Sequence, residues 1–497
     1  MKKFLAMLLA LCFVFAIVAG CSKDPGKTGD DTTANQGGDV TTAGETKKWY
    51  DDLDYQGLDL AIACRGQAYD DYVIGRENSG DIVWDSIFDT NERINGAINV
   101  NREFIFGSSS SADFIAQAIN ESRNDGIYDM IMCDQFHGTA YAADGAYLNV
   151  LGLDTEKNFI DITQPYWYGD YMKNVTMGTK TLYFLGGDIS PTILGWAACS
   201  FMNLNLYEDL FNDIDAFLDE VEAGNWDIDM LREKDTAAYL DLNQNDKVDL
   251  DDRLGSATSK GQSAVFAAIS AGMTFSQRNS EGLYDLTIDT EENNRIFEKV
   301  YDMYVETLGF FRYDFSATPN GNVDTFAAGR MLFMNEYFLY AFKETLREME
   351  DDYVIIPRPK CDENQEKYLS AMQDSFFLYT IPTAVATDKL EAISAYLQVG
   401  CELFSENVIT AMYENALKVK HVSDKVDMEK AGRIIDLVRA GITSDFAVVY
   451  TKSMNGMANM VGQLVDASRR DWHGAVGLQK KMYETFLEDL LLNFDVS

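Results

Sequence analysis

Residues 241–252 carry oxygen-bearing side chains at the spacing of a calcium-binding loop. An EF-hand-type loop takes side-chain oxygens from positions 1, 3, 5, 9 and 12 and a backbone carbonyl from position 7. This stretch supplies them as Asp241, Asn243, Asn245, Asp249 and Asp252, with the carbonyl from Lys247. Asp246 stands where glycine usually makes the sharp turn, and an aspartate replaces the usual glutamate at position 12. The spacing predicts a structural Ca²⁺ site, and the alternative is a solvated acidic turn.

Histidine and cysteine chemistry is less favoured. The three histidines, His137, His421 and His473, are too few and too scattered for a histidine metal site or a His-based triad. After Cys21 the cysteines are odd in number and widely spaced; they are Cys64, Cys133, Cys199, Cys361 and Cys401. Their apolar surroundings predict buried free thiols rather than a disulfide framework. The sequence contains no Gly-x-Ser-x-Gly, P-loop, Cys-x-x-Cys or His-Glu-x-x-His motif.

Met1 to Cys21 has the layout of a lipoprotein signal. Two lysines precede an almost unbroken apolar run from 4 to 18, and two small residues stand before Cys21. The segment 18–21 resembles a lipobox, so residues 1–20 are the predicted signal peptide and Cys21 the predicted lipidation site. An ordinary signal peptide cut near Gly20 is the alternative. Residues 21–47 are rich in Gly, Thr and Asp and nearly free of large apolar residues, which predicts a disordered tether. The expected location is the extracellular face of the cell membrane.

Charge and length limit the remaining possibilities. The formal net charge is −39, from 80 acidic and 41 basic residues. A surface this acidic repels phosphate backbones, so nucleic acid is not an expected partner. No later stretch approaches the ~20 apolar residues of a spanning helix, so we expect membrane attachment through the lipid anchor alone. The ~450 residues after the tether exceed one usual core, which predicts two or more lobes.

Apolar patterns near the start of the folded region alternate between strands and helices. Residues 57–64 and 128–133 predict strands, and residues 80–94 and 112–122 predict amphipathic helices between them. This order is typical of an α/β lobe with a parallel sheet. Asp134 directly follows the second strand, at the position where such sheets place ligand contacts.

Later segments continue the mixed pattern. Residues 181–190 predict a strand that ends in a loop, and residues 196–202 predict a continuous strand. Residues 206–221, 390–404 and 474–494 predict helices with one apolar face. The last helix is expected to close the second lobe.

Four further segments occur in a recognisable order. They are 225–229 (Asn-Trp-Asp-Ile-Asp), 241–255, 326–333 and 353–360. Together they resemble the extracellular solute-binding proteins of carbohydrate ABC importers, the maltose-binding-like family. The resemblance covers roughly residues 48–497. It implies an α/β, two-lobed periplasmic-binding-protein-like fold of type II, with a ligand cleft between lobes that crossing segments join.

The resemblance also implies the lobe boundaries. Crossings are expected at 196–202, at 374–382 and near 412–421. Lobe 1 would then comprise 48–197 and 373–415, and lobe 2 would comprise 198–372 and 416–497.

The function that the resemblance implies is non-enzymatic. A monomeric receptor would capture a mono- or oligosaccharide and deliver it to ABC transporter permease subunits by interlobe closure. Sugar sites need aromatic faces for C–H surfaces and polar side chains for hydroxyl groups. The ligand-binding candidates are Trp167, Trp196, Asp374, Tyr166, Tyr337, Phe376, Trp472 and Asp134. The alternatives are a surface carbohydrate-binding or sensing lipoprotein without an importer, and a secreted glycoside hydrolase, whose pair of carboxyls nothing in the sequence marks.

Overall fold

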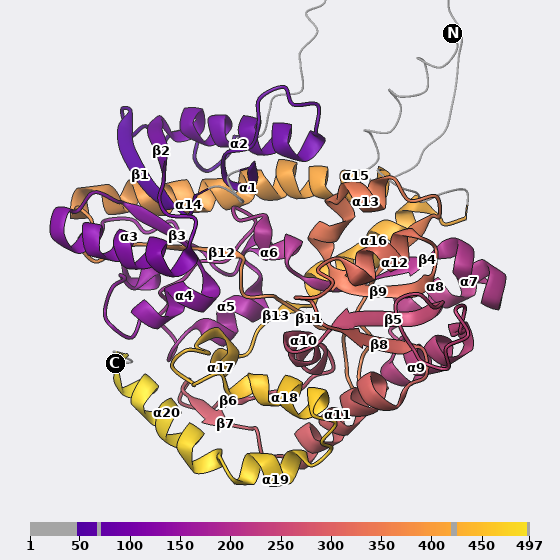
Figure 1. Ribbon diagram of the computed structural model, residues 1–497. Coiled ribbons are helices and arrows are strands. Elements are labelled where there is room, and N and C mark those ends of the chain that lie inside the picture. Colours follow the sequence, from indigo (N-terminus) through magenta and orange to yellow (C-terminus); the bar gives the residue numbers. More distant parts are fainter. Residues whose placement is uncertain (1–46, 67–70, 419–424, 495–497) are drawn as a thin grey trace, which may run out of the picture. The chain divides into compact units, whose positions relative to one another are not determined.

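Two β-sheets with flanking helices organise the chain from Trp49 onwards (Figure 1). The computed structural model describes residues 47–66, 71–418 and 425–494. Met1–Lys48 is a separate unit of which only Lys47 and Lys48 are described. The predicted signal peptide, Cys21, the tether up to residue 46 and His421 therefore lie outside the described residues. No described helix is long and apolar enough to cross a membrane.

The first sheet has the order β12-β3-β1-β2. Strands β1 (Leu58–Cys64), β2 (Val100–Phe106) and β3 (Met130–Asp134) are parallel, and β12 (Phe377–Thr380) runs antiparallel to β3. Helices α2 (Ile82–Ile98) and α3 (Ser111–Asp125) connect the parallel strands. Asp81 caps α2 by accepting hydrogen bonds from the backbone N–H groups of Val83 and Trp84. The predicted parallel α/β arrangement is confirmed.

The second sheet has the order β10-β4-β9-β5-β8. Its strands are β4 (Ala198–Asn203), β5 (Leu254–Ser259), β8 (Phe310–Tyr313), β9 (Met331–Tyr337) and β10 (Tyr353–Pro357). Only β4 runs antiparallel to its neighbours β9 and β10, whereas β5 runs parallel to both β8 and β9. The carboxyl ends of four strands and the start of β4 therefore meet at one edge of this sheet.

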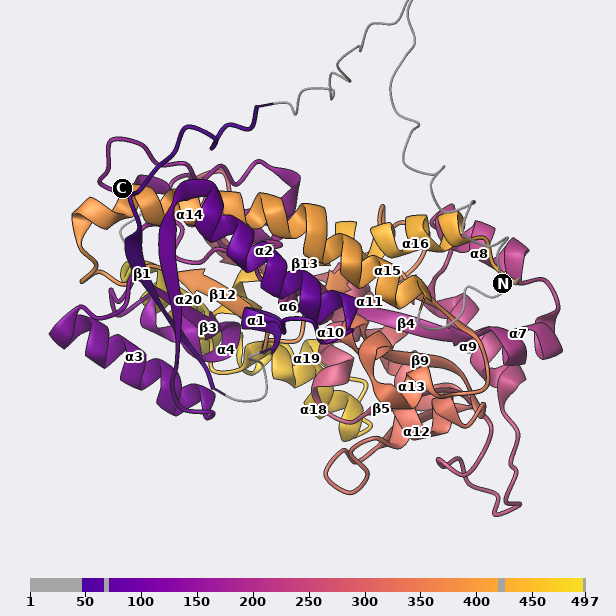
Figure 2. The same ribbon diagram turned by 90° about the horizontal axis from the view of Figure 1, so that it is seen from above.

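Three segments pass between the two sheets. Ala197 forms an antiparallel bridge with Met372, and the Gln373 N–H donates to the Trp196 carbonyl at 3.2 Å, so the first two segments pair with each other. The third is α14 (Leu390–Phe404), which continues through a π-helical turn (Ser405–Ile409) into α15 (Thr410–Lys418). Figure 2 shows this helix running past α2 towards the second sheet. The first sheet takes its strands from 48–197 and 373–415 and the second from 198–372, while the lobe boundaries themselves stay a prediction.

Shorter elements surround the sheets. The remaining strands are β6 (Ser276–Arg278), β7 (Tyr284–Leu286), β11 (Ser370–Ala371) and β13 (Ile442–Thr443). The remaining α-helices are α1 (Asp71–Ile74), α4 (Gln135–Gly138), α5 (Gly169–Val175), α6 (Thr192–Gly195), α7 (Leu204–Phe211), α8 (Ile214–Glu222), α9 (Ile228–Ala238), α10 (Gln262–Ser270), α11 (Glu291–Tyr301), α12 (Gly321–Ala327), α13 (Glu344–Arg347), α16 (Met428–Ala440), α17 (Phe446–Val449), α18 (Met460–Asp466), α19 (Trp472–Gly477) and α20 (Lys480–Leu492).

Three predicted elements differ from the structure. Residues 181–190 form only isolated bridges. At Gly187 a Cβ would lie 2.4 Å from the Cys401 sulfur, so the segment packs tightly against α14, and it meets the first sheet at the single bridge between Leu185 and Tyr379. The helix predicted at 206–221 breaks at Asn212, whose φ of +70° ends α7. The C-terminal helix is divided into α19 and α20.

Phe494, which follows α20, contacts Tyr183, a residue predicted to lie in lobe 1. The Phe494 ring lies 5.6 Å from the Tyr183 ring and 5.5 Å from the Tyr450 ring. The C-terminal segment therefore contacts both predicted lobes instead of closing the second alone.

The cysteine prediction is confirmed. Cys64, Cys133, Cys199, Cys361 and Cys401 are free and buried. Burial raises the pKa of the Cys361 thiol to about 11, which disfavours the reactive thiolate.

Candidate functional site

A cavity of about 550 Å³ lies at the carboxyl edge of the second sheet. Open α/β sheets bind ligands outside the carboxyl ends of their strands, and the ends of β5, β8, β9 and β10 all contribute here. The lining residues are Trp196, Ala198, Thr258, Ser259, Lys260, Gly261, Gln262, Ser263, Phe266, Tyr313, Phe315, Asn335, Glu336, Tyr337, Tyr340, Arg358 and Gln373. We refer to this space as the edge cavity.

Two predicted ligand residues form an aromatic wall of the edge cavity. The rings of Trp196 and Tyr337 meet edge to face at 5.3 Å between centroids. Phe266 and Tyr340 pack on Tyr337 at 6.1 and 6.2 Å. Trp196 lies on the first crossing and Tyr337 ends β9, so the wall spans the first crossing and the second sheet. Such rings can cover the C–H face of a sugar.

Two predicted acidic residues meet at the carboxyl edge of the first sheet. Asp134 ends β3, and the Phe136 N–H donates to the Asp374 carbonyl at 3.4 Å. One Asp134 oxygen lies 2.9 Å from the His137 ring nitrogen, while the other is buried without a hydrogen-bond partner. Burial and the nearby Asp134 raise the pKa of the Asp374 carboxyl. Because Asp374 follows Gln373, which lines the edge cavity, this pair lies next to the second crossing.

Three predicted ligand residues belong instead to the hydrophobic core. Trp167 and Phe376 are 0 % exposed and Trp472 is 1 % exposed. The indole N–H of Trp167 donates to Gln398 at 2.9 Å, and that of Trp472 donates to the Ile288 carbonyl at 3.0 Å. Since internal partners satisfy both indoles, an aromatic residue outside a periodic pattern can still be core. The expectation that these three present a face to ligand is corrected in this conformation.

Tyr166 lies at a different cavity. Its hydroxyl accepts a hydrogen bond from Gln398 at 2.9 Å, in a space of about 540 Å³ shared with Trp49 and Phe159. Trp196 and Tyr337 do not line that space.

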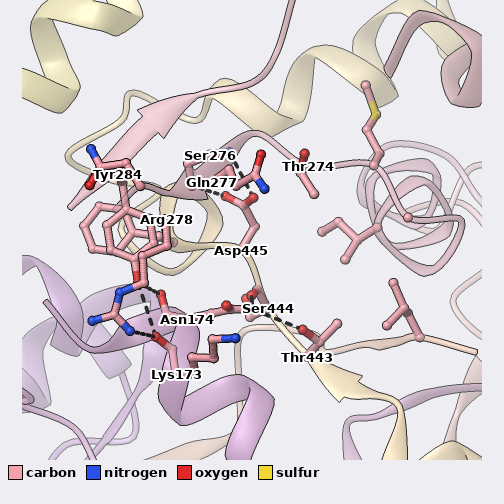
Figure 3. A pocket seen from close by; sticks show the side chains of 16 residues that line it. Lys173, Asn174, Thr274, Ser276, Gln277, Arg278, Tyr284, Thr443, Ser444 and Asp445 are labelled. Atoms are coloured by element: carbon pink, nitrogen blue, oxygen red, sulfur yellow. Dashed lines mark hydrogen bonds between the residues drawn. The ribbon is translucent and has the colours of Figure 1, made fainter. Parts of the chain in front are cut away.

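A further cavity of about 450 Å³ lies between α5, the β6–β7 hairpin and β13 (Figure 3). Its central polar groups bind one another: Asp445 accepts from the Ser276 hydroxyl at 2.7 Å, and the Tyr284 hydroxyl donates to the Asn174 carbonyl at 2.6 Å. The Tyr284 ring stacks on Phe446 at 3.9 Å. Because these polar groups already hydrogen-bond to one another, we interpret the cavity as a contact between α5, the β6–β7 hairpin and β13 rather than as a ligand site.

In the predicted calcium loop, side-chain carboxylate oxygens accept hydrogen bonds from backbone N–H groups of the same loop. Asp241 accepts from the backbone N–H groups of Asn245 (3.3 Å) and Asp246 (2.9 Å). Asp252 is 0 % exposed and accepts from the Asp249 N–H at 3.1 Å. Asp246 has φ +58°, the positive value that the sharp turn at position 6 requires.

The donor set restricts how this loop could hold a metal. No group of three His, Cys, Asp or Glu side chains in the described part of the chain could hold a metal ion. Calcium would therefore need the amide oxygens of Asn243 and Asn245 and the Lys247 carbonyl as well as carboxylates. The side-chain amides of Asn243 and Asn245 now donate to Asp249 at 3.2 and 2.7 Å, and the Asn245 contact is the main cause of a lowered pKa of Asp249. A bound ion would replace these contacts.

Several residues that line the edge cavity were not predicted from the sequence. Arg358 and Asn335 are 6 % and 4 % exposed and line the edge cavity. Arg358 directly follows β10, and Glu336 lies near the end of β9. Polar side chains that follow a fully buried strand were the signal used for Asp134, and the same signal applied to 353–360 would have found Arg358.

Comparisons with known proteins address the family and the fold of this chain. No protein-family model matches the chain, and no match was found among curated proteins. Many solved structures are similar in fold, and three of them are compared with this chain. An ABC substrate-binding protein from Listeria monocytogenes in complex with cycloalternan has a TM-score of 0.54 at 7% identity, over 87% of this chain and 99% of that one.

The other two comparisons agree. UspC of Mycobacterium tuberculosis has a TM-score of 0.51 at 11% identity, over 87% of this chain and 100% of that one. An ABC transporter solute-binding protein from Thermotoga lettingae bound with α-D-tagatose has a TM-score of 0.50 at 12% identity, with coverage of 87% and 100%. The chain therefore has the two-lobed α/β fold of ABC solute-binding proteins.

Proposed function

We propose that this chain, whose fold is that of ABC solute-binding proteins, is a lipid-anchored extracellular receptor for a solute. It captures a mono- or oligosaccharide in the edge cavity and delivers it to the permease subunits of an ABC importer. The observation that carries the proposal is the position of that cavity, at the carboxyl edge of the second sheet and beside the first crossing. Ligand and hinge therefore share residues, which lobe closure requires.

The composition of the cavity supports a sugar ligand. Aromatic rings supplied by Trp196, Tyr337 and Tyr340 stand beside amide, hydroxyl and guanidinium groups. Aromatic rings suit C–H faces, and the polar groups suit hydroxyls. Two of the similar structures were solved with carbohydrates, cycloalternan and tagatose.

The anchor completes the proposal. A lipid on Cys21 and a tether of about 27 residues would keep the receptor near a membrane partner, raising the effective concentration of bound solute there. We propose a monomer at the extracellular face of the cell membrane. A sensing lipoprotein without an importer would share this anchor and this cavity.

A glycoside hydrolase is the weaker alternative. That chemistry uses two carboxyls on either side of the scissile bond. Among the residues that line the edge cavity, Glu336 is the one carboxyl.

We also propose that the 241–252 loop binds a structural Ca²⁺. The support is the positive φ of Asp246 and the inward placement of Asp241 and Asp252. The ion would be held by the residues named in the sequence prediction, and its role would be to cross-link the connection between α9 and β5.

Labelled oligosaccharides test the receptor proposal. A thermal-shift screen over neutral and acidic saccharides should raise the melting temperature for a specific ligand by mass action. Calorimetry should then give one site per chain, and chromatography of the incubated sugar should show no cleavage. Hydrolysis would establish the enzyme instead, and the absence of binding by any saccharide would contradict a sugar receptor.

A further inference from the structure

Arg358 is a buried cation without a carboxylate partner. It lines the edge cavity and is 6 % exposed. Its hydrogen-bond partner is the Tyr304 hydroxyl, and it forms no salt bridge with any carboxylate in the described ranges. Buried charges in proteins are normally paired, because transfer from water is costly. The guanidinium is therefore available for a charge that the protein itself does not supply.

The two carboxyls that the charge of Arg358 influences have other partners. Asn322 and the Tyr340 hydroxyl hydrogen-bond to Glu336, and the Ser256 hydroxyl donates to Asp235 at 2.8 Å. Burial raises the pKa of Glu336 to about 7 and that of Asp235 well above its ordinary value. Both groups thus compensate the guanidinium less than two ionised carboxylates would.

Helix α10 adds positive potential to the edge cavity. Helix α10 begins at Gln262 without a side-chain cap, and Gly261 to Ser263 line the cavity. The first backbone N–H groups of a helix attract negative charge. Lys260 precedes this turn and also lines the cavity. In a chain with 80 acidic and 41 basic residues, this lining reverses the ratio, with two cations and one carboxyl.

An unsatisfied donor points to the same ligand chemistry. The side-chain nitrogen of Asn335 is buried without a hydrogen-bond partner, while its oxygen accepts from the Ser200 hydroxyl at 2.6 Å. Asn335 is 4 % exposed and lines the cavity beside Glu336. A buried donor left unpaired costs free energy that an acceptor on a ligand would recover.

We infer that the ligand of the edge cavity is a saccharide carrying an anionic group, a sugar carboxylate, which Arg358, the Asn335 amide and the first turn of α10 receive. This inference rests on the proposed function and narrows its ligand class. Guanidinium and carboxylate form paired hydrogen bonds of fixed geometry, which selects for the acid form. The acidic surface does not prevent this, because exposed charges are screened beyond ~8–10 Å.

Matched sugars test the inference on the intact protein. Oligogalacturonides, their methyl esters and neutral α-1,4-linked galactose oligomers of equal length differ in charge at C6 of each sugar and little in shape. We expect thermal stabilisation and calorimetric binding with the acids and at least about tenfold weaker binding with the esters. A galactose 6-phosphate arm distinguishes a sugar acid from a sugar phosphate. If the sugar phosphate binds more tightly than the sugar acid, the anionic group of the ligand is a phosphate and the inferred carboxylate is wrong.

Charge-removing variants locate the effect. Arg358→Gln should weaken binding of the acid at least about tenfold and weaken binding of the ester much less, because the ester offers the guanidinium a hydrogen-bond acceptor but no charge. Lys260→Gln should weaken binding of the acid by a smaller factor. Because Lys260 is exposed, this variant should fold, and it tests the charge even if the buried Arg358→Gln variant does not fold. Arg433→Gln is the matched control, because Arg433 is exposed and pairs with Glu222 away from the cavity.

The outcomes separate this inference from the proposed function. If neutral saccharides bind as tightly as acids, the anionic ligand is wrong and the receptor stands. If no saccharide of either kind binds, both are wrong. Equal losses for acid and ester in Arg358→Gln would assign Arg358 a structural role and overturn its part in recognition.

Discussion

The Trp196 ring meets the Tyr337 ring edge to face, with centroids 5.3 Å apart and 67° between the planes. Trp196 belongs to the first crossing, where its carbonyl accepts the Gln373 N–H, and Tyr337 ends a strand of the second sheet. The pair therefore joins the first crossing to the wall of the edge cavity. A rotation of the crossing would move one ring against the other, so a ligand that packs on both rings favours one arrangement of the hinge.

Trp196→Ala should weaken saccharide binding by about tenfold, because it removes one ring of the aromatic wall. Trp196 is only partly buried, so the folded state should persist. Calorimetry with the ligand found in the thermal-shift screen measures the loss. Trp49→Ala is the control, since Trp49 is 42% exposed and lies outside the edge cavity. Equal affinity of Trp196→Ala and the wild type would remove this ring from the site.

Trp167→Ala should unfold the protein more easily without changing the site. Its fully buried indole packs in the core and donates to Gln398, so truncation should cost about 3–5 kcal/mol of unfolding free energy. Urea denaturation measures the cost. Trp167→Phe, which keeps a ring but loses the donor, should cost less. Undiminished stability together with lost binding would return Trp167 to the ligand site.

The sequence could predict the fold more fully than the site, for a physical reason. Strand and helix periodicity reflects burial along one element, so β1, α2, α3, β3 and α14 were found close to their observed bounds. The edge cavity depends on which strand ends meet across the second sheet, and that register is not encoded in any one segment. Thus Trp196, a candidate from the first crossing, lines this cavity, whereas Arg358 and Asn335 also line it without having been predicted.

The buried aromatic residues show why sequence patterns also suggest site residues that lie in the core. Trp167, which stands outside any periodic pattern, and Trp472 are both predicted ligand contacts. Each satisfies its indole N–H inside the protein, with Gln398 and the Ile288 carbonyl. Partners this distant in the chain cannot be read from local composition.

Glu336 should make folding stability depend on pH. Its folded pKa of about 7 exceeds the ordinary 4.5, chiefly because burial disfavours the charged form. Asn322, Tyr340, Lys343 and Arg358 surround it and oppose this shift. The stabilisation is complete below pH 4.5 and is lost as pH rises through about 7.

The measurement is a pair of urea titrations at acidic and neutral pH. The wild type should lose roughly 3 kcal/mol more than Glu336→Gln between them. Glu488→Gln, at an exposed position on α20, should follow the wild type. Parallel pH profiles for the wild type and Glu336→Gln would contradict a raised pKa at this carboxyl.

Cys21→Ser should release the protein from the cell surface while leaving ligand binding intact. The acyl chains would be the attachment, and the edge cavity lies in the unit that begins at Trp49. Fractionation of expressing cells and calorimetry of the released protein check the two halves. Retention of Cys21→Ser in the membrane fraction would contradict lipidation at this residue.

Calcium should stabilise the connection between α9 and β5. Chelation with EGTA should lower the melting temperature of the wild type, because binding to the folded state adds stability by mass action. Asp241→Ala removes a carboxylate that orders the loop and should abolish the calcium response.

Asp246→Gly provides the sharper comparison. Asp246 holds φ +58°, a conformation that glycine adopts without strain, and its side chain is not among the expected ligands. The variant should therefore keep the calcium response and gain up to about 1 kcal/mol of stability from relief of that strain. A melting temperature unaffected by calcium and chelator in the wild type and in Asp246→Gly alike would identify 241–252 as a solvated acidic turn.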